Sequence, residues 1–475
     1  MSMRPETWET FRKAAEILDF SLIGLLILQF CLFLVIFVAA SVAMHQRPPF
    51  ASPALLWSRY AHIAPPITVL APAYNEAATI IESVEALLAL EYPAFEVIVV
   101  NDGSSDDTLQ KLVDRFDLRR AARLCDRVAP HAPIRGFYAS PRVPRLLVVD
   151  KENGGGKADA INAGLNASRT PIICITDADT LVEPDALLRA VWPFIDDPLT
   201  VAVGGTICIA NGSIVDAGRV VEARLPMNFL ALVQALEYQR VFLVTRVGLS
   251  QLGAMAIVSG AFGLFRRDAV MEVGGYSLGT VGEDLELVVK LHRHFRESKR
   301  PYSIRFVAEP VVWTQAPESL RDLGRQRARW QRGALETIWK HRSLALNPRY
   351  GTVGLISFGQ IILLDVIGPL VAVTGYVFVP LSWAVGVLSH AHFMAFLAAV
   401  FSLGILMSVL SLVFEQVILG RIERSRDLAT LGVVAVLENF GYRQLCNLWR
   451  IQGWWQYLRR REQWGPMRRK GFKRE

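Results

Sequence analysis

Carboxylates placed directly after runs of β-branched residues are the feature that most constrains how this chain can fold. Asp102 follows one such run, and Asp177 and Asp179 follow another. Between residues 66 and 205 these runs alternate with helical patterns, which is typical of a doubly wound, mostly parallel sheet in an α/β domain. Because the carboxyl ends of parallel strands form the ligand-binding edge of such a sheet, we expect the three carboxylates to face one ligand.

The same alternation predicts the individual elements. The expected strands cover residues 67–71, 95–100, 145–149, 172–176 and 201–204, and the expected helices cover 76–90, 105–116 and 157–167. The stretch 117–144, rich in arginine, alanine and proline, indicates an irregular insertion. After residue 205 the pattern becomes more helical, and we expect a long helix over 220–247.

Long apolar runs explain why hydrophobic residues make up 52% of this 475-residue chain. Residues 18–43 are long enough to cross a bilayer, which takes about 20 apolar residues. Charged residues precede this run and it lacks a small-residue cleavage pattern, so we interpret it as an anchor rather than a removed signal peptide. Further transmembrane helices are expected over 353–420, where Pro369 and Pro380 break the pattern. Polar residues interrupt 428–457, which we interpret as interfacial or re-entrant, with a hairpin crossing as the alternative.

The net charge of +7 is confined to one end of the chain. From Arg450 onward nine basic residues face two acidic ones, an excess equal to the whole net charge. No basic face is implied elsewhere, which argues against nucleic-acid binding. A basic tail over 458–475 suits the cytoplasmic side of a membrane with anionic lipids. We therefore expect a multi-pass protein of the plasma (inner) membrane, with the α/β domain and the tail in the cytoplasm and the N-terminal segment 1–17 outside.

The triplet Asp177-Ala178-Asp179 carries the first chemical signal. Two carboxylates one residue apart, at the end of a strand, can bind a hard divalent cation that also bridges diphosphate oxygens. Such triplets are common by chance, so their weight depends on neighbouring motifs. Tyr74 and Glu76 after the first strand, together with Asp102 after the second, can pack against and hydrogen-bond a nucleoside.

Three charged residues stand at expected helix starts. Lys157 follows three glycines, which suits a contact to phosphate, although the spacing is not that of a Walker loop. Glu283 and Asp284 open another helix. One of these carboxylates could act as a general base, but acidic residues favour a helix start whether or not they do chemistry.

The last motif lies on a helix expected over 317–345, with Pro317 in its first turn. Gln326, Arg329 and Trp330 occupy neighbouring positions there and offer an amide, a guanidinium for a diphosphate and an indole for a sugar face. The arginines and apolar residues of this amphipathic helix suit the membrane interface. The motifs thus follow the order that a sugar transfer from a nucleotide diphosphate requires.

In these motifs and their order the chain resembles the membrane-embedded family-2 glycosyltransferases, the group of cellulose, hyaluronan, chitin-oligosaccharide and poly-N-acetylglucosamine synthases. The resemblance covers about residues 64–345, and the helix entry 156–164 is most similar to the poly-N-acetylglucosamine branch. It implies a GT-A domain over 64–316, a UDP-sugar donor, Mg2+ or Mn2+, and inversion at the anomeric carbon. The acceptor would be a growing polysaccharide, exported across the membrane.

The resemblance also implies a role for each motif residue. Tyr74, Glu76, Asp102 and Lys157 would contact the nucleotide, Asp177 would lie near the ribose and the metal, Asp179 would ligate the metal, Asp284 would be the base beside Glu283, and Gln326, Arg329 and Trp330 would hold the diphosphate and the acceptor end.

Two alternatives stay open. A glycolipid synthase, which transfers a single sugar to a membrane lipid, can share the same motifs. A non-catalytic receptor or assembly subunit is less favoured, because every expected acidic position is filled.

Two features depart from several relatives. A single crossing lies ahead of the catalytic domain, and Gly282 stands where the cellulose branch has threonine. Export or regulatory subunits are further possible partners, beside membrane lipids.

Overall fold

A ten-stranded sheet forms the centre of the computed structural model, which describes residues 5–46, 52–178, 180–216, 218–420, 422 and 424–459. The strand order is β3-β4-β5-β2-β1-β6-β11-β8-β12-β7. The strands are β1 (Ile67–Ala73), β2 (Phe95–Asp102), β3 (Arg119–Ala121), β4 (Ile134–Ala139), β5 (Leu146–Lys151), β6 (Ile172–Thr176), β7 (Leu181–Val182), β8 (Thr200–Ile209), β11 (Phe262–Arg266) and β12 (Ser303–Thr314). The central strands β5, β2, β1 and β6 are parallel. The expected doubly wound α/β fold class is confirmed.

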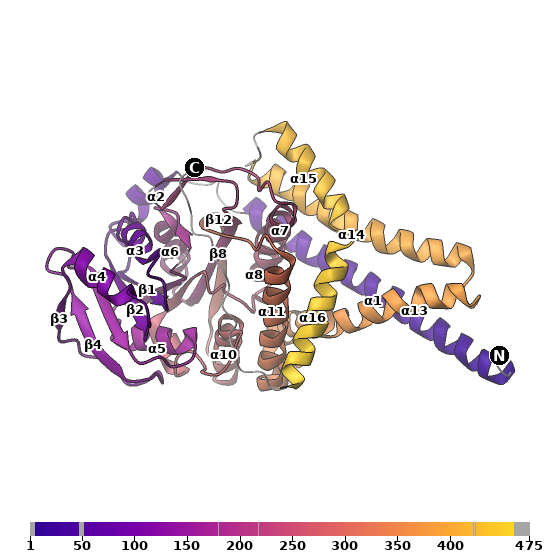
Figure 1. Cartoon of the computed structure of the whole chain (residues 1–475), viewed down its shortest axis with the longest axis horizontal. Helices are drawn as coiled ribbons and strands as arrows, with labels where there is room; N and C mark the ends of the chain where they lie inside the picture. The colour runs from indigo at the N-terminus through magenta and orange to yellow at the C-terminus, as the bar shows by residue number, and fades with distance from the viewer. Residues whose placement is uncertain are drawn as a thin grey trace.

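The five predicted strands correspond to β1, β2, β5, β6 and β8. They are buried on both faces, which explains why they read as continuous apolar runs rather than as alternating patterns. Helices cover both faces of the sheet (Figure 1). In the N-terminal half these helices are α2 (Pro53–Tyr60), α3 (Ile80–Leu88), α4 (Thr108–Phe116), α5 (Lys157–Ala167) and α6 (Ala186–Asp196).

The expectation of an irregular insertion over 117–144 holds for residues 122–133 and is wrong for the two strands on either side of them. The segment contains β3 and β4, which extend the sheet at one edge: β4 pairs antiparallel with β5, and β3 pairs antiparallel with β4. Short strands with many exposed arginines lack the apolar alternation that would have marked them, because an edge strand has little core to cover.

The helix expected over 220–247 begins later than predicted. A small hairpin of β9 (Ile214–Asp216) and β10 (Arg219–Glu222) comes first. The side chain of Asn228 then caps the helix by accepting hydrogen bonds from the backbone N–H groups of Leu230 and Ala231. From there the helical path runs through α7 (Phe229–Gln239), the π-helical η1 (Arg240–Arg246) and α8 (Val247–Gln251).

Three helices complete the α/β domain: α9 (Arg267–Glu272), α10 (Glu283–Glu297) and α11 (Leu320–Lys340). The last one starts at Leu320 because the Ser319 side chain accepts a hydrogen bond from the backbone N–H of Asp322. Pro317 therefore lies before the helix and not in its first turn. Two short 3-10 turns, η2 (Arg342–Leu344) and η3 (Pro348–Tyr350), lead onward from α11.

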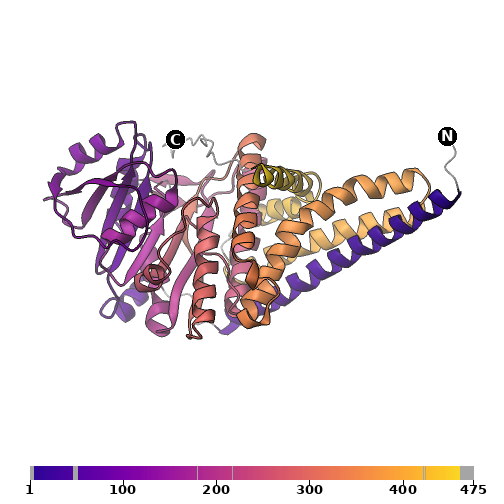
Figure 2. The same ribbon diagram turned by 90° about the horizontal axis from the view of Figure 1, so that it is seen from below.

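Among the described residues three helices are long and apolar enough to cross a membrane: Glu16–Gln46 within α1 (Pro5–Gln46), the run Val353–Ala384, and α14 (His390–Ile418). They lie side by side and project away from the sheet (Figures 1 and 2). The run Val353–Ala384 comprises η4 (Val353–Ser357), α12 (Phe358–Gln360), η5 (Ile361–Ile367) and α13 (Gly368–Ala384). Contrary to expectation, the helical path continues through Pro369 and Pro380, with π-helical turns ahead of the first proline.

The chain ends in two helices, α15 (Ser425–Leu437) and α16 (Tyr442–Leu458). Helix α16 runs along α11 (Figure 1). Their contact is close at Gly324, where a Cβ would lie 2.7 Å from the Trp449 indole nitrogen. Helix α16 therefore joins the C-terminal region to the helix that carries Gln326, Arg329 and Trp330. Residues 460–475, which hold most of the predicted basic tail, lie outside the described residues.

Candidate active site

One large cavity, with a volume of about 3430 Å³, opens at the carboxyl ends of β1, β2 and β6. It is lined by ten of the predicted site residues: Tyr74, Glu76, Asp102, Lys157, Asp177, Glu283, Asp284, Gln326, Arg329 and Trp330. Asp179 lies outside the described residues. Side chains from positions 74 to 330 are therefore gathered into one space by the fold.

Asp102 occupies the sheet-edge position that its place after a strand predicts. Strands β1 and β2 pair in parallel with Ala73 opposite Asn101, so Tyr74 and Asp102 emerge at the same edge. Asp102 is buried, and its Oδ1 accepts a hydrogen bond from Lys151 Nζ at 2.5 Å. Lys151 is itself fully buried and also pairs with Asp159. The pattern of residues had not singled out Lys151, which fixes the orientation of the Asp102 carboxylate.

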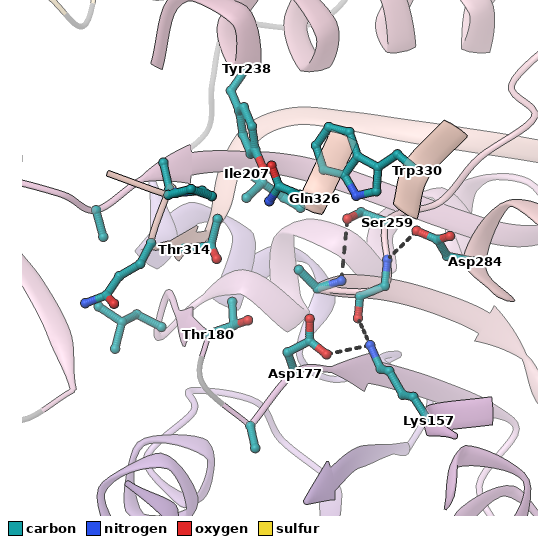
Figure 3. Close-up of a pocket in the computed structure, with 18 of the residues that line it drawn as sticks. Lys157, Asp177, Thr180, Ile207, Tyr238, Ser259, Asp284, Thr314, Gln326 and Trp330 are labelled. Carbon is teal, nitrogen blue, oxygen red and sulfur yellow. Dashed lines mark hydrogen bonds and ion pairs between the residues drawn. The ribbon is translucent and has the colours of Figure 1, made fainter. Parts of the chain in front are cut away.

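Lys157, at the start of α5, forms an ion pair with Asp177 after β6. Its Nζ lies 2.5 Å from Asp177 Oδ1 and donates to the carbonyl oxygen of Gly260 at 2.8 Å (Figure 3). Burial acts to lower the pKa of Lys157, but the charges of Asp177, Glu283 and Asp284 outweigh it and raise the pKa above its ordinary value. The lysine therefore keeps its positive charge at the carboxylate edge.

Asp284 and Glu283 lie in the first turn of α10 and differ in their surroundings. Asp284 Oδ1 accepts from the backbone N–H of Leu285 at 2.8 Å, and its Oδ2 accepts from the N–H of Gly260 at 3.2 Å. Glu283 is buried, and burial together with the charge of Asp284 raises its pKa to about 7. One carboxylate of the pair is thus held by backbone donors, while the other retains its proton up to neutral pH.

Gly260 links the two halves of the site, and sequence analysis did not identify it. Its carbonyl accepts from Lys157 and its N–H donates to Asp284. A Cβ at this position would lie 3.1 Å from Lys157 Nζ, so a larger residue would displace the lysine. The available signal was the run of small residues Ser259-Gly260-Ala261 just before β11.

Helix α11 presents Gln326 and Trp330 to the cavity (Figure 3). The Trp330 side chain is 44% exposed, which leaves its ring accessible to a ligand. Arg327 lies beneath, with its guanidinium carbon 4.5 Å from the indole centroid. It is fixed by ion pairing with Glu237 at 2.6 Å and by a hydrogen bond to the hydroxyl oxygen of Tyr442 at 3.1 Å. These contacts link Arg327 to α7 and α16 and fix the guanidinium against the indole.

Glu336, on the same helix, supports the loop that precedes α10. Its Oε2 accepts from the backbone N–H of Val281 at 2.9 Å and from the hydroxyl of Thr280 at 3.2 Å. The start of α10, which carries Glu283 and Asp284, is therefore linked by hydrogen bonds to α11, which carries Trp330. The motif pattern alone had given no role to Glu336.

The acidic residues at the sheet edge fit a hard divalent cation. The Asp177 carboxylate lies in the cavity, and Asp179 follows two positions later in the sequence. Carboxylate oxygens are the donors that Mg2+ and Mn2+ prefer. The described residues contain no cluster of three or more His, Cys, Asp or Glu side chains suited to a metal. A partial protein ligand set completed by substrate phosphates is the usual arrangement for Mg2+.

Comparison with known proteins agrees with this geometry. Residues 65–333, more than half of the chain, match the family model described as glycosyltransferase like family 2. The chain belongs to the family-2 glycosyltransferases. This family-2 chain is 28% identical over 296 residues to the poly-β-1,6-N-acetyl-D-glucosamine synthase of Staphylococcus aureus (strain COL) and 27% identical over 295 residues to that of Staphylococcus epidermidis. Each match covers 62% of this chain and 61% of the relative.

Among solved structures, this glycosyltransferase is similar to the mannosyltransferase PcManGT from Pyrobaculum calidifontis, determined in complex with GDP-Man and Mn2+. The TM-score is 0.57 at 19% sequence identity, over 93% of this chain and 99% of that one. The likeness supports the fold, including the long helices beyond the sheet.

Proposed function

We propose that this family-2 enzyme is an inverting, metal-dependent membrane glycosyltransferase that adds sugars from a UDP-sugar to the growing end of a polysaccharide. The observation that carries the proposal is the continuity of the cavity. It extends from Asp102 at the sheet edge past Trp330 to Ser357, Gln360 and Asp365. The last three are polar residues on a helical run apolar enough to cross a membrane. A donor site that opens onto a membrane helix suits an acceptor that leaves through the membrane.

The donor would bind at the sheet edge. Tyr74, Glu76 and Asp102 would contact the base and ribose, and Lys157 would contact phosphate. Asp177 and Asp179 would hold Mg2+ or Mn2+, which offsets the charge of the departing diphosphate. The PcManGT complex with GDP-Man and Mn2+ supports a nucleotide-sugar donor and a divalent cation for this fold.

The transfer step follows from the position of Asp284. Its carboxylate would accept the proton of an acceptor hydroxyl as that oxygen bonds to the anomeric carbon. The bond from the anomeric carbon to the diphosphate breaks on the opposite face, and UDP leaves with the electron pair, so the configuration inverts. Hydrogen bonds from Gly260 and Leu285 aim the carboxylate, while Glu283 keeps its own proton near neutral pH.

The acceptor would lie against Trp330. An indole face packs well against a pyranose ring, and Gln326 and Arg329 could hold the diphosphate and the acceptor end. The staphylococcal relatives, named as poly-β-1,6-N-acetyl-D-glucosamine synthases, support N-acetylglucosamine as the transferred sugar. The product would then be an amino-sugar polymer.

The three apolar helices support a multi-pass protein. We place it in the plasma (inner) membrane, with the catalytic domain and the tail in the cytoplasm and the polymer exported outward. Accessory export or regulatory subunits would act with it there.

A glycolipid synthase is the second candidate. The end of the cavity at Gln360 and Asp365 would also admit the headgroup of a membrane lipid. Both candidates share the donor chemistry and differ in the product.

Reconstituted protein incubated with Mg2+ or Mn2+ and a panel of UDP- and GDP-sugars tests the proposal. Release of UDP from UDP-N-acetylglucosamine, with sugar incorporated into a product that a poly-N-acetylglucosamine hydrolase digests, is the expected result. The Asp284→Asn protein serves as the blank. Transfer by the wild-type protein from GDP-sugars alone, or no wild-type transfer above this blank, would contradict the proposal.

A further inference from the structure

Arg246, the last residue of η1, is a buried arginine with no carboxylate partner among the described residues. It is 8% exposed and lines the active-site cavity. Neither its Nε nor its Nη1 has a hydrogen-bond partner in the part of the chain that the structure describes. Its guanidinium carbon lies 4.0 Å from the ring centroid of Phe242. Because an unpaired buried guanidinium costs folding free energy, a ligand is the natural source of the missing acceptors.

Two other arginines nearby, one partly buried and one buried, show what a structural arginine looks like in this protein. Arg240, on the same π-helix, pairs with Glu438 at 2.7 Å. Arg327 pairs with Glu237 at 2.6 Å. Both tie one helix to another through a carboxylate. Arg246 makes no such link among the described residues, so helix packing does not account for it.

Its surroundings place Arg246 on the membrane side of the site. Helix η1 packs against the long helices α1 and α14 on one side and against strands β8 and β12 on the other. Burial lowers the pKa of Arg246 to about 10, and the nearby Asp284 charge opposes this shift. The guanidinium therefore stays charged at neutral pH and close to the proposed base.

Resting on the proposed function, we propose that Arg246 binds the acceptor by donating hydrogen bonds from its guanidinium group to oxygen atoms of the sugar whose hydroxyl faces Asp284. Hydroxyl and amide-carbonyl oxygens of an N-acetylated pyranose are suitable acceptors. The Phe242 ring fixes the plane of the guanidinium, and the fork of donors then selects sugar orientation. The acceptor would thus lie between Arg246 on one side and Trp330 on the other.

The test uses Arg246→Met in the full-length protein, with UDP-N-acetylglucosamine as donor and an N-acetylglucosamine tetrasaccharide as acceptor. We expect the acceptor KM to rise roughly tenfold or more, because hydrogen bonds to a charged donor are lost. The Kd for UDP should stay within about twofold, since the donor contacts lie elsewhere. The Tm should equal or exceed that of wild type, because an unpaired buried charge has been removed.

Two further variants sharpen the result. Arg246→Lys keeps the charge without the planar fork, so an intermediate acceptor KM is expected. Arg305→Met makes the same chemical change at an exposed ion pair with Asp197. This variant should leave the acceptor KM and the Kd for UDP unchanged. A wild-type acceptor KM in both Arg246 variants would overturn the inference while leaving the proposed function intact. A parallel loss of UDP affinity, or a lower Tm without a change in acceptor KM, would also overturn it. A wild-type protein that transfers nothing would instead defeat the proposed function.

Discussion

Gly282 and Gly333 bring the start of α10 and the middle of α11 into backbone contact. A Cβ built on Gly333 would lie 2.8 Å from the Cα of Gly282, closer than real side chains approach. Glycine at both positions lets the two helices touch. The contact sets the spacing between Asp284, two residues after Gly282, and Trp330, three residues before Gly333. The proposed base and the proposed acceptor platform are thus positioned by one packing point.

Gly333→Ala should separate these helices. Overpacking a close contact costs about 1–3 kcal/mol, and a displacement of about 1 Å in a catalytic geometry can cost about a hundredfold in rate. We expect a lower Tm and a transfer rate reduced by up to about a hundredfold. Gly432→Ala is the matched control, because a Cβ there meets nothing within 4 Å and should be tolerated. Equal activity in the two variants would show that the contact does not set the site.

Asp284→Asn should lower the transfer rate by about 10²–10⁴ while UDP binds nearly as before, because a general base acts on the acceptor and adds little to donor affinity. Single-turnover transfer and UDP titration measure the two effects. Asp268→Asn is the control, because Asp268 is also an acidic residue in the first turn of a helix. If Asp284 only stabilised the helix dipole, the two variants would have similar effects on the rate. The assignment fails if UDP affinity falls as far as the rate.

Glu283 should make stability depend on pH. Its folded-state pKa of about 7 lies above the ordinary value of 4.5, so the folded protein keeps a proton that the unfolded chain has lost. The stabilisation from that proton is therefore present at low pH and is lost as pH rises from about 4.5 through 7. Between pH 5 and 8, the Tm of wild type should fall relative to Glu283→Gln.

Glu286→Gln is the control for this titration, one helical turn further on. Burial opposes ionisation of Glu286, but hydrogen bonds from His341 and Lys340 lower its pKa to about 2. The Glu286 carboxyl itself should therefore stay ionised between pH 5 and 8 and should take up no proton of its own over that range. A constant Tm difference between wild type and Glu283→Gln over that range would refute the raised pKa.

Asp179→Ala should remove activity and its dependence on divalent metal together, because the cation neutralises the departing diphosphate. Titration of Mg2+ and Mn2+ against transfer rate is the measurement. Transfer that persists in chelator, in wild type or variant, would show that Asp179 is not a metal ligand.

The parallel strands were predictable because buried β-branched runs leave a clear pattern. The same holds for the carboxylates after them, since topology alone brings the strand ends to one edge. Strands β3 and β4 escaped prediction because β3 is short and mostly exposed, and because β4 is only partly buried and lacks a continuous apolar run. The capping side chain of Asn228, rather than apolar periodicity, sets where the later helix begins.

The supporting residues of the site could not be read from the sequence. Lys151 matters because it is buried against Asp102, and Gly260 matters because it bridges Lys157 and Asp284. Both depend on contacts between segments far apart in the chain. Arg246 stands out for the partners its side chain lacks among the described residues, which only the packed structure reveals.

The length of the product tests the central claim most directly. Wild-type protein in liposomes, given UDP-N-acetylglucosamine and excess short acceptor, should build long chains at early times while most acceptor stays unextended. Trp330→Ala should yield short chains or none with UDP affinity preserved, because stacking aligns the acceptor for attack. A single sugar on one extractable lipid, from wild type, would contradict the polysaccharide-synthase account.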